Sequence, residues 1–208
     1  MARVPNLEPR WNISPGTDVL AVRDGPAGRE TPTLQWGFIP GNSTDPAIGH
    51  RLVNARAESA HVTQAFRQAF RSRRCVLPAD GFYEWEAVVG AKKKQPWRVE
   101  PAGGGTLALG GLWEAWRSRE GEVRETVTIL TVKANSVLAE IHDRMPVLIT
   151  ERDLSLWLSP SSSVDQARAI CVPAPDASLT AWRISMAINT PGNEDIGVTA
   201  PAMDKPIA

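Results

Sequence analysis

The sequence predicts an α+β fold, in which a mostly antiparallel, curved or barrel-like β-sheet forms the core and a few helices flank it. Three observations support this prediction. Short runs of β-branched and aromatic residues outnumber the segments with helical spacing, turn-forming residues separate the runs, and no internal repeat or long linker divides the chain. We therefore expect residues 1–208 to form a single domain.

Eight short runs are predicted as strands because β-branched and aromatic residues dominate them. In chain order they cover residues 18–22, 33–39, 75–78, 82–87, 96–99, 106–113, 125–132 and 146–149. Residues 88–94, with small residues and three lysines, are predicted to connect two strands of a hairpin. Residues 102–105 are predicted to form another turn.

Three segments have helical character. Alanines and phenylalanines recur at three- and four-residue spacing over residues 58–70, which predicts one amphipathic helix. Residues 150–158 form a second candidate, with Thr150 as the N-cap and Asp153 three residues later. Residues 164–170 are predicted as a third, short helix.

Composition excludes several classes of protein. The 23 basic and 23 acidic residues balance, so any attraction to nucleic acid must come from a local patch. No run approaches the ~18 apolar residues of a membrane span, and the first residues lack the apolar core of a signal peptide. We expect a cytoplasmic monomer with no membrane partner. Two cysteines and three histidines argue against a disulfide framework and a structural zinc site. No other pattern indicates a metal or an organic cofactor, and we expect neither.

Two short segments carry polar residues that could either form turns or take part in binding and catalysis. Residues 10–16, which include Pro15, contain Asn, Pro and Gly, and the pattern alone favours a turn before a strand. Asn54 and Arg56 would point to the same side of an extended segment. They could position a reactive group and hold a phosphate, or Asn54 could cap a turn while Arg56 pairs with Glu58. Spacing does not separate these alternatives.

Glu84 lies among aromatic residues in a predicted strand. Alternation places Phe82, Glu84 and Glu86 on one face, and Tyr83 and Trp85 on the other. A glutamate in apolar surroundings can have a raised pKa and transfer protons near neutrality. The alternative is that Glu84 lies on the exposed face of an amphipathic strand, and the alternation fits that alternative well.

His142 stands between an Ile and an Asp–Arg pair, just before an apolar strand, where an acid–base histidine often lies. Spacing identifies no serine or cysteine nucleophile to complete a triad, and a lone histidine is more often structural. The stretch from Arg51 to Arg74 carries six arginines against one glutamate. Such a strip suits a phosphate backbone, although a solvated helix face would produce the same run.

These segments occur together, in order, with several others. They are RWNISP (10–15), WGFIP (36–40), VNARAE (53–58), RCVLPADGFYEW (74–85), KQPW (94–97), LALGGLW (107–113) and IHDRMPVL (141–148). This series resembles the SOS response-associated peptidase (SRAP) family, and seven motifs in register make the resemblance very specific. The resemblance spans nearly the whole chain and implies an SRAP-like fold.

The resemblance implies a function in the response to DNA damage. Members of the family recognise abasic sites in single-stranded DNA. A cysteine exposed by removal of the initiator Met attacks the ring-opened sugar and closes a thiazolidine, which leaves a covalent protein–DNA crosslink. This self-processing underlies the family's description as peptidases. The implied partner is therefore single-stranded DNA with abasic sites, and hydrolase, protease or lyase chemistry is expected.

The resemblance also assigns roles to individual residues. Asn54 matches the residue that orients the cysteine, and Arg56 matches a phosphate contact. Glu84 matches the glutamate that relays protons near the α-amine, and His142 matches the histidine that assists sugar ring opening and crosslink reversal. Thr131 matches a threonine that contacts the abasic sugar. Arg51, Trp36 and Pro15 are expected to add to the DNA-binding surface.

Two departures from the family pattern stand out. Family members begin Met-Cys-Gly-Arg, whereas this sequence begins Met1-Ala2-Arg3 and reaches the first motif at once. We expect the family's N-terminal strand, helix and nucleophile to be missing. Cys75 is expected to be buried and Cys171 to lie at a helix end or in a loop, and neither carries an α-amine. Asn42 stands where the family has an aromatic residue, and a lost stacking platform costs about 1–3 kcal/mol per base.

Three explanations of the missing cysteine remain open. The sequence could be truncated or start at an internal Met, and the retained Glu84, His142, Asn54 and Arg56 favour this explanation. It could instead be a degenerate member that binds DNA without crosslinking. The third alternative is a protein-interaction module that retains only the fold. In each case we expect a polypeptide of these 208 residues to be inactive in crosslinking.

Overall fold

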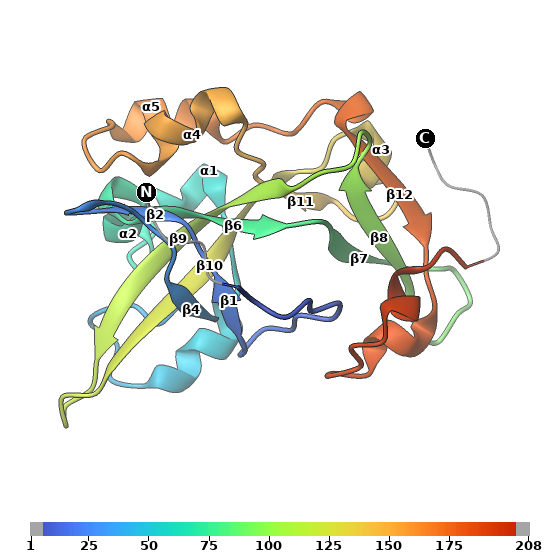
Figure 1. The fold of residues 1–208 in the computed structure, drawn as a ribbon, viewed down its shortest axis with the longest axis horizontal. Helices are drawn as coiled ribbons and strands as arrows, with labels where there is room; N and C mark the ends of the chain where they lie inside the picture. The colour runs from blue at the N-terminus through green and yellow to red at the C-terminus, as the bar shows by residue number, and fades with distance from the viewer. Residues whose placement is uncertain (1–5, 203–208) are drawn as a thin grey trace.

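The computed structural model describes residues 6–202, and its largest element is a seven-stranded sheet (Figure 1). Five strands follow the order β1-β4-β10-β9-β6, and β5 and β11 also pair with β10. Their bounds are Asp18–Leu20 (β1), Thr33–Trp36 (β4), Asn54–Arg56 (β5), Arg74–Ala79 (β6), Leu107–Arg117 (β9), Val123–Lys133 (β10) and Arg144–Pro146 (β11).

The sheet curls until its two ends meet. Just beyond β1, Val22 exchanges two backbone hydrogen bonds with Val76 of β6, at 2.8 and 2.9 Å. Right-handed strand twist favours this curvature. Most pairings are antiparallel, and only β4 and β5 run parallel to β10. The predicted α+β class with a mostly antiparallel, curved sheet is therefore confirmed.

A smaller antiparallel sheet stands beside the curled one, in the order β12-β8-β7 (Figure 1). It contains Phe82–Glu86 (β7), Gln95–Pro101 (β8) and Leu179–Arg183 (β12). The register pairs Glu84 with Trp97, which confirms the predicted hairpin connection between β7 and β8. A separate hairpin joins Arg23–Gly25 (β2) to Gly28–Glu30 (β3).

The helices are short. They are Ala57–Ala60 (α1), Arg67–Ser72 (α2), Ser136–Ala139 (α3), Glu151–Leu158 (α4) and Val164–Ile170 (α5), with 3-10 turns at Pro46–Arg51, Asp176–Ser178, Met186–Asn189 and Ile196–Thr199. The helix predicted over residues 58–70 is wrong as one unit, because a turn separates α1 from α2. The Thr63 hydroxyl donates to the Ser59 carbonyl in that turn, at 2.9 Å. A side chain that bonds nearby backbone competes with helix continuation.

Two other helices follow the sequence closely. Thr150 caps α4 by accepting a hydrogen bond from the backbone N–H of Asp153, as predicted. The bounds of α5 are those expected from the sequence, and Ser163 with Gln166 forms a capping box at its start. The last predicted strand is displaced, since β11 ends at Pro146. The Val147 carbonyl and the Ile149 N–H bond to β9 instead.

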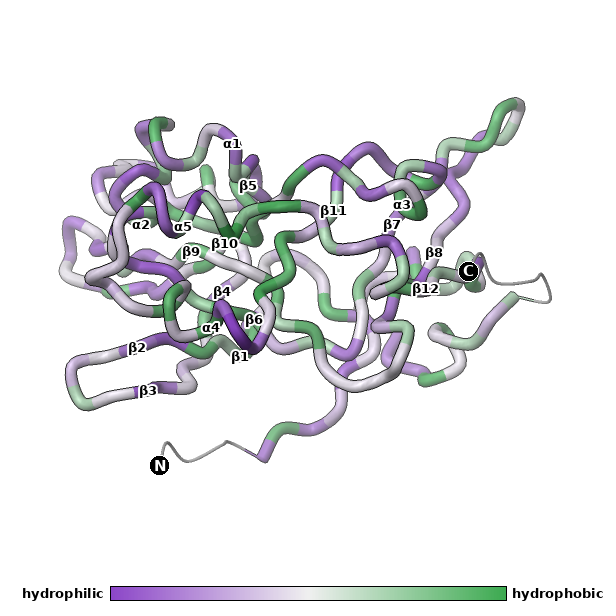
Figure 2. The backbone as a smooth tube through the Cα atoms, turned by 90° about the horizontal axis from the view of Figure 1, so that it is seen from above, coloured by the Kyte–Doolittle hydropathy of each residue, from purple (hydrophilic) through white to green (hydrophobic). Residues whose placement is uncertain are grey.

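The core lies inside the curled sheet and under α4, and its largest fully buried side chains are Trp157, Phe38, Phe70, Leu34, Leu112 and Leu130. Several of the hydrophobic stretches run through the middle of the backbone in Figure 2. Cys75 is fully buried, as expected. Cys171 forms the C-cap of α5, at the expected helix end.

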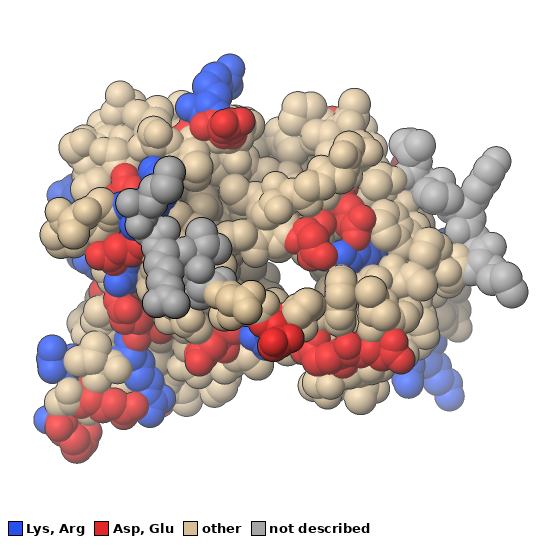
Figure 3. All heavy atoms as spheres, in the orientation of Figure 1, with Lys and Arg blue, Asp and Glu red and all other residues tan. Residues whose placement is uncertain are grey.

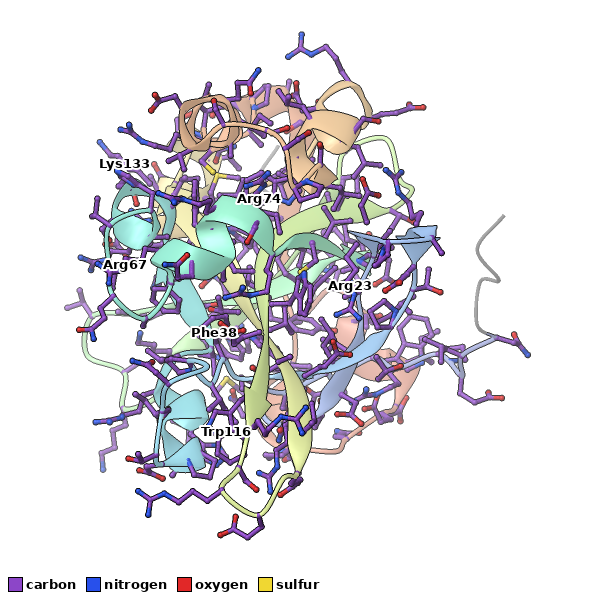
Figure 4. All side chains as sticks on the ribbon, turned by 90° about the vertical axis from the view of Figure 1, so that its left-hand side faces the viewer. Arg23, Phe38, Arg67, Arg74, Trp116 and Lys133 are labelled. Atoms are coloured by element: carbon purple, nitrogen blue, oxygen red, sulfur yellow. The ribbon has the colours of Figure 1, made fainter. Side chains whose placement is uncertain are left out.

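The predicted arginine strip is wrong at Arg74, which does not lie on the surface. Its side chain is buried, and its guanidinium donates to the backbone carbonyls of Phe70, Trp157 and Ser159 (Figure 4). Arg73 pairs with Glu114 at 2.6 Å. Two of the six arginines are therefore engaged by the protein itself, because the end of α2 and the start of β6 turn them inward. Arg51, Arg56, Arg67 and Arg71 remain exposed.

Candidate functional site

Strand β10 brings the predicted site residues together through its pairing register. On one side, Val127 pairs with Trp36, Ile129 with Asn54, and Thr131 with Arg56. On the other side, Thr131 pairs with Pro146 and Lys133 pairs with Arg144. Trp36, Asn54 and Arg56, which come from two separate motifs, therefore lie in order along β10, to which Thr131 itself belongs.

Asn54 and Arg56 point away from the core, as the alternation predicts. Both side chains are exposed, whereas the intervening Ala55 is only 3% exposed. Neither side chain forms a hydrogen bond or ion pair with residues 6–202. The alternative in which Arg56 pairs with Glu58 is wrong, since Arg144 holds Glu58. The alternative in which Asn54 caps a turn is also wrong, since Asn54 lies in a parallel strand.

Arg144 forms the main polar connection beneath these residues. Its two terminal nitrogens donate to the two carboxylate oxygens of Glu58, at 2.8 and 2.7 Å. One of the same nitrogens also lies 3.4 Å from the Thr131 hydroxyl oxygen. The hydrogen bonds from Arg144 lower the pKa of Glu58, against the opposing effect of partial burial. Arg144 thus ties the start of α1 to β10 and β11.

Glu84 and His142 approach one another from different elements. Glu84 belongs to β7, and His142 lies between α3 and β11. The distance from His142 Nδ1 to Glu84 Oε2 is 3.8 Å, and the Glu84 side chain is 19% exposed. Burial raises the pKa of Glu84 to about 7, while the charges of His142 and Lys94 oppose that rise. The alternative that places Glu84 on an exposed strand face is therefore wrong.

The imidazole of His142 is oriented by the backbone of its neighbour. The Arg144 N–H donates to Nδ1 of His142 at 3.1 Å. In the neutral ring, Nδ1 then accepts and the ring proton resides on Nε2. Asp143 Oδ1 lies 3.5 Å from the same Nδ1, on a side chain that is 83% exposed. Arg144 therefore contacts Glu58 and Thr131 through its side chain and His142 through its backbone.

The remaining predicted residues, Trp36, Pro15 and Arg51, lie in segments that adjoin Asn54 in space or in sequence. The indole N–H of Trp36 donates to the Val53 carbonyl at 2.9 Å, one residue before Asn54. Pro15 is exposed in a turn whose next residue, Gly16, donates its N–H to the Trp36 carbonyl. Arg51 is exposed at the end of a 3-10 turn. Gly16 and Trp36 also line a cavity of about 230 Å³ with Pro46, His50 and Arg124.

The site lies on one side of the molecule. In Figure 2 the labels of β5, α1, β11 and β7 lie in the upper half, which faces away from the viewer in Figures 1 and 3. The opposite face carries interspersed acidic and basic side chains, without a continuous basic surface (Figure 3). Figure 4 places Lys133 and Arg67 together on the site's side.

Arg144 is the site residue that sequence reasoning did not single out. It stands two residues after His142, in a segment read only as the approach to a strand. The pairing that reveals it joins positions 86 residues apart, so no local spacing could have identified Glu58 as its partner. The available signal was Glu58, the only acidic residue in the arginine-rich stretch. Its presence predicts an ion pair, but the sequence does not indicate which arginine is the partner.

The described residues place no three histidine, cysteine, aspartate or glutamate side chains together in an arrangement suited to a metal ion. Among residues 6–202, no helix has the length and apolar character needed to cross a membrane.

Comparisons with known proteins match most of the chain. The family model described as SOS response associated peptidase (SRAP) matches residues 1–191. The Bacillus subtilis abasic site processing protein YobE is 34% identical over 184 residues, covering 88% of this chain and 84% of that protein. The Escherichia coli abasic site processing protein YedK is 29% identical over 197 residues, covering 92% and 84%.

The fold also matches a solved structure. A crystal structure of a Bacteroides thetaiotaomicron protein superimposes with a TM-score of 0.83 at 22% identity, covering 90% of this chain and 82% of that one. At this identity the likeness concerns the fold alone. The family match, the identity to YobE and the ordered motifs agree. This chain belongs to the SOS response associated peptidase (SRAP) family.

Proposed function

We propose that this chain processes abasic sites in single-stranded DNA, by holding the strand along β5 and β10 and opening the abasic sugar with Glu84 and His142. One observation carries the proposal: Glu84, a half-buried glutamate whose pKa is raised to about 7 by burial, lies 3.8 Å from His142. Arg56, which is exposed and forms no ion pair with the described residues, pairs with Thr131 of β10. The names of YobE and YedK as abasic site processing proteins support the choice of substrate.

In this proposal the strand lies over the exposed residues of the site. Arg56 holds a phosphate, because its guanidinium makes no ion pair within residues 6–202 and suits bidentate binding of phosphate oxygens. Thr131 offers a hydroxyl to the sugar from the neighbouring position on β10. Arg51, Trp36 and Pro15 extend the surface for the adjoining nucleotides, and Asn54 orients the reacting group.

Glu84 and His142 would open the closed sugar by general acid–base catalysis. The ionised Glu84 carboxylate takes the proton of the anomeric hydroxyl, and the C1′–O4′ bond breaks as the aldehyde forms. The Nε2–H of His142 donates a hydrogen bond to the departing ring oxygen, and that oxygen then takes the proton held by Glu84. Each proton has one donor and one acceptor, so the step balances without a cofactor. A catalytic carboxyl with a pKa near 7 works best at physiological pH.

We further propose that these 208 residues form no thiazolidine crosslink. That chemistry needs a thiol and an α-amine on the same residue, and the only cysteines are Cys75 and Cys171. Burial raises the pKa of both thiols, that of Cys171 to about 12, so both stay protonated at neutral pH. The sugar opened by this polypeptide is therefore expected to remain free.

The test uses a single-stranded oligonucleotide with one abasic site and an alkoxyamine probe that labels the open aldehyde. At saturating probe, labelling is limited by ring opening, and the protein should accelerate it. Glu84→Gln should reduce the acceleration by about tenfold or more, since general acid–base catalysis contributes ~10²–10⁴-fold. The matched control is Glu120→Gln, which removes an exposed carboxylate from the β9–β10 turn.

A denaturing gel of the same reactions tests the absence of a crosslink. An adduct that survives heat and detergent would overturn the claim about the cysteines. Equal labelling with and without the protein would overturn the proposed sugar opening. If Arg56→Gln still weakened DNA binding in that case, the chain would be a DNA-binding member without catalysis. If the wild-type chain bound no DNA, only a protein-interaction module would remain.

A further inference from the structure

A second polar cavity lies outside the site described above. It has a volume of about 280 Å³ and is lined by His61, Arg67, Gln68, Arg71 and Val164. His61 follows α1 directly, Arg67, Gln68 and Arg71 belong to α2, and Val164 begins α5. The cavity thus lies where the α1–α2 turn faces the start of α5, and no acidic side chain lines it.

The two arginines of the cavity form an electrostatically unfavourable pair. Arg67 and Arg71 are four residues apart on α2, and like charges at this spacing destabilise a helix. Neither forms an ion pair with the residues that the structure describes. By contrast, Arg168 of the neighbouring helix α5 forms an ion pair with Asp165 at 3.2 Å. An anion in the cavity would relieve the repulsion between Arg67 and Arg71.

His61, which also lines this cavity, carries an unsatisfied ring nitrogen. Its Nδ1 is buried and has no hydrogen-bond partner among the described residues. Its ring lies against Phe70, with 6.1 Å between ring centroids, which limits how far it can turn away. A buried polar atom without a partner costs free energy, so such atoms usually serve a ligand or another group. The Gln68 amide supplies further donors at the rim.

We propose that this cavity binds a phosphate group, held by Arg67 and Arg71 with His61 and Gln68 as additional donors. Guanidinium groups bind phosphate oxygens in pairs, and two of them on one helix face match the charge of the group. The phosphate could belong to a DNA strand or be free in solution. Placing it in DNA rests on the proposed function, and we favour this source because of where the cavity lies.

The position of the cavity relative to Arg56 supports a DNA phosphate. Arg56 ends β5, α1 follows at once, and His61 comes directly after α1. At a helical rise of about 1.5 Å per residue, the five residues from Arg56 to His61 move the chain by only ~8 Å. Figure 4 shows Arg67 on the same side of the molecule as Lys133, whose strand partner is Arg144. A strand that leaves Arg56 along α1 therefore reaches the cavity.

The experiment measures binding of a labelled single-stranded oligonucleotide by fluorescence anisotropy over a range of salt concentrations. Arg67→Gln and Arg71→Gln should each weaken binding by about fivefold to tenfold. Each should also reduce the slope of log K against log salt by ~0.7, the value for one phosphate contact on a single strand. The matched control is Arg119→Gln, an exposed arginine in the β9–β10 turn, and it should leave both quantities unchanged.

A second measurement uses inorganic phosphate alone, followed through the ring resonances of His61 by NMR. Phosphate should shift these resonances in the wild-type chain and not in the Arg67→Gln Arg71→Gln double variant. Shifts without any effect on DNA binding would assign the cavity to free phosphate. The proposal is overturned if both arginine variants behave like Arg119→Gln with DNA and phosphate leaves His61 unmoved. If the wild-type chain binds no DNA, the proposed function fails, and the phosphate titration still decides the cavity.

Discussion

Nδ1 of His142 accepts a hydrogen bond from the Arg144 N–H and lies 3.8 Å from Oε2 of Glu84. The charge of His142 lowers the pKa of the Glu84 carboxyl group, but burial of that group has the larger effect. This explains how a glutamate can lie beside a histidine and still have its pKa raised to about 7. The first two predictions follow from this relationship.

Replacing Glu84 should stabilise the protein in alkaline solution. Because the pKa of Glu84 is about 7 in the folded chain and near 4.5 when unfolded, the folded state binds more protons between these values. Wild-type stability attributable to Glu84 therefore falls as pH rises through that window. Glu84→Gln should be more stable by about 2–3 kcal/mol at pH 8, with no difference near pH 4. Urea unfolding at both pH values, with Glu120→Gln as control, checks this; a constant difference would contradict it.

Sugar opening should depend on the ionised form of Glu84. The rate of aldehyde labelling is expected to rise with pH and level off, with a midpoint at about 7. Glu84→Gln should abolish this dependence rather than displace it, because the titrating group is removed. The measurement is the labelling rate between pH 5 and 9 at constant ionic strength. A wild-type midpoint near 4.5 would show that burial does not control this carboxyl group in solution.

Arg74 and Arg56 should have opposite effects when replaced, although both belong to the arginine-rich stretch. Arg74→Met would leave buried carbonyls of Phe70 and Trp157 without a donor and should cost about 2–4 kcal/mol of stability. Arg56→Gln should leave stability within about 0.5 kcal/mol, as expected for an exposed side chain. Thermal unfolding and DNA anisotropy on both variants check this. Arg56→Gln alone should weaken DNA binding, and equal effects in either assay would contradict the assignment.

Arg144 and Glu58 should act as one unit in positioning β5 and α1. The pair is partly exposed, so Arg144→Lys and Glu58→Gln should each cost less than about 1 kcal/mol of stability. Each should nevertheless lower DNA affinity, because α1, which directly follows Arg56, loses its side-chain tie to β10 and β11. A double-mutant cycle on DNA affinity gives the test. The double variant should lose no more than either single variant, and additive losses would show that the two residues act independently.

The sequence predicted the elements whose signals are local. The cap at Thr150, the bounds of α5 and the hairpin between β7 and β8 depend on residues a few positions apart. The elements that it missed are held by distant partners. The three residues of β5, Asn54–Arg56, form a strand because they pair with β10. Likewise, β12 forms because it pairs with β8. Short strands carry too little propensity of their own to be predicted.

By itself, the sequence determined the α+β class, the curved antiparallel sheet and the family. Alternation, turn residues and ordered motifs are properties of the residue order along the chain and do not depend on tertiary contacts. The sequence also placed Asn54 and Arg56 on one side of an extended segment. Only the tertiary structure decided that Glu84 is buried next to His142, that Arg144 rather than Arg56 binds Glu58, and that Arg74 is internal. Burial and ion pairing depend on which surfaces meet when the sheet curls, and those contacts join residues far apart in the chain.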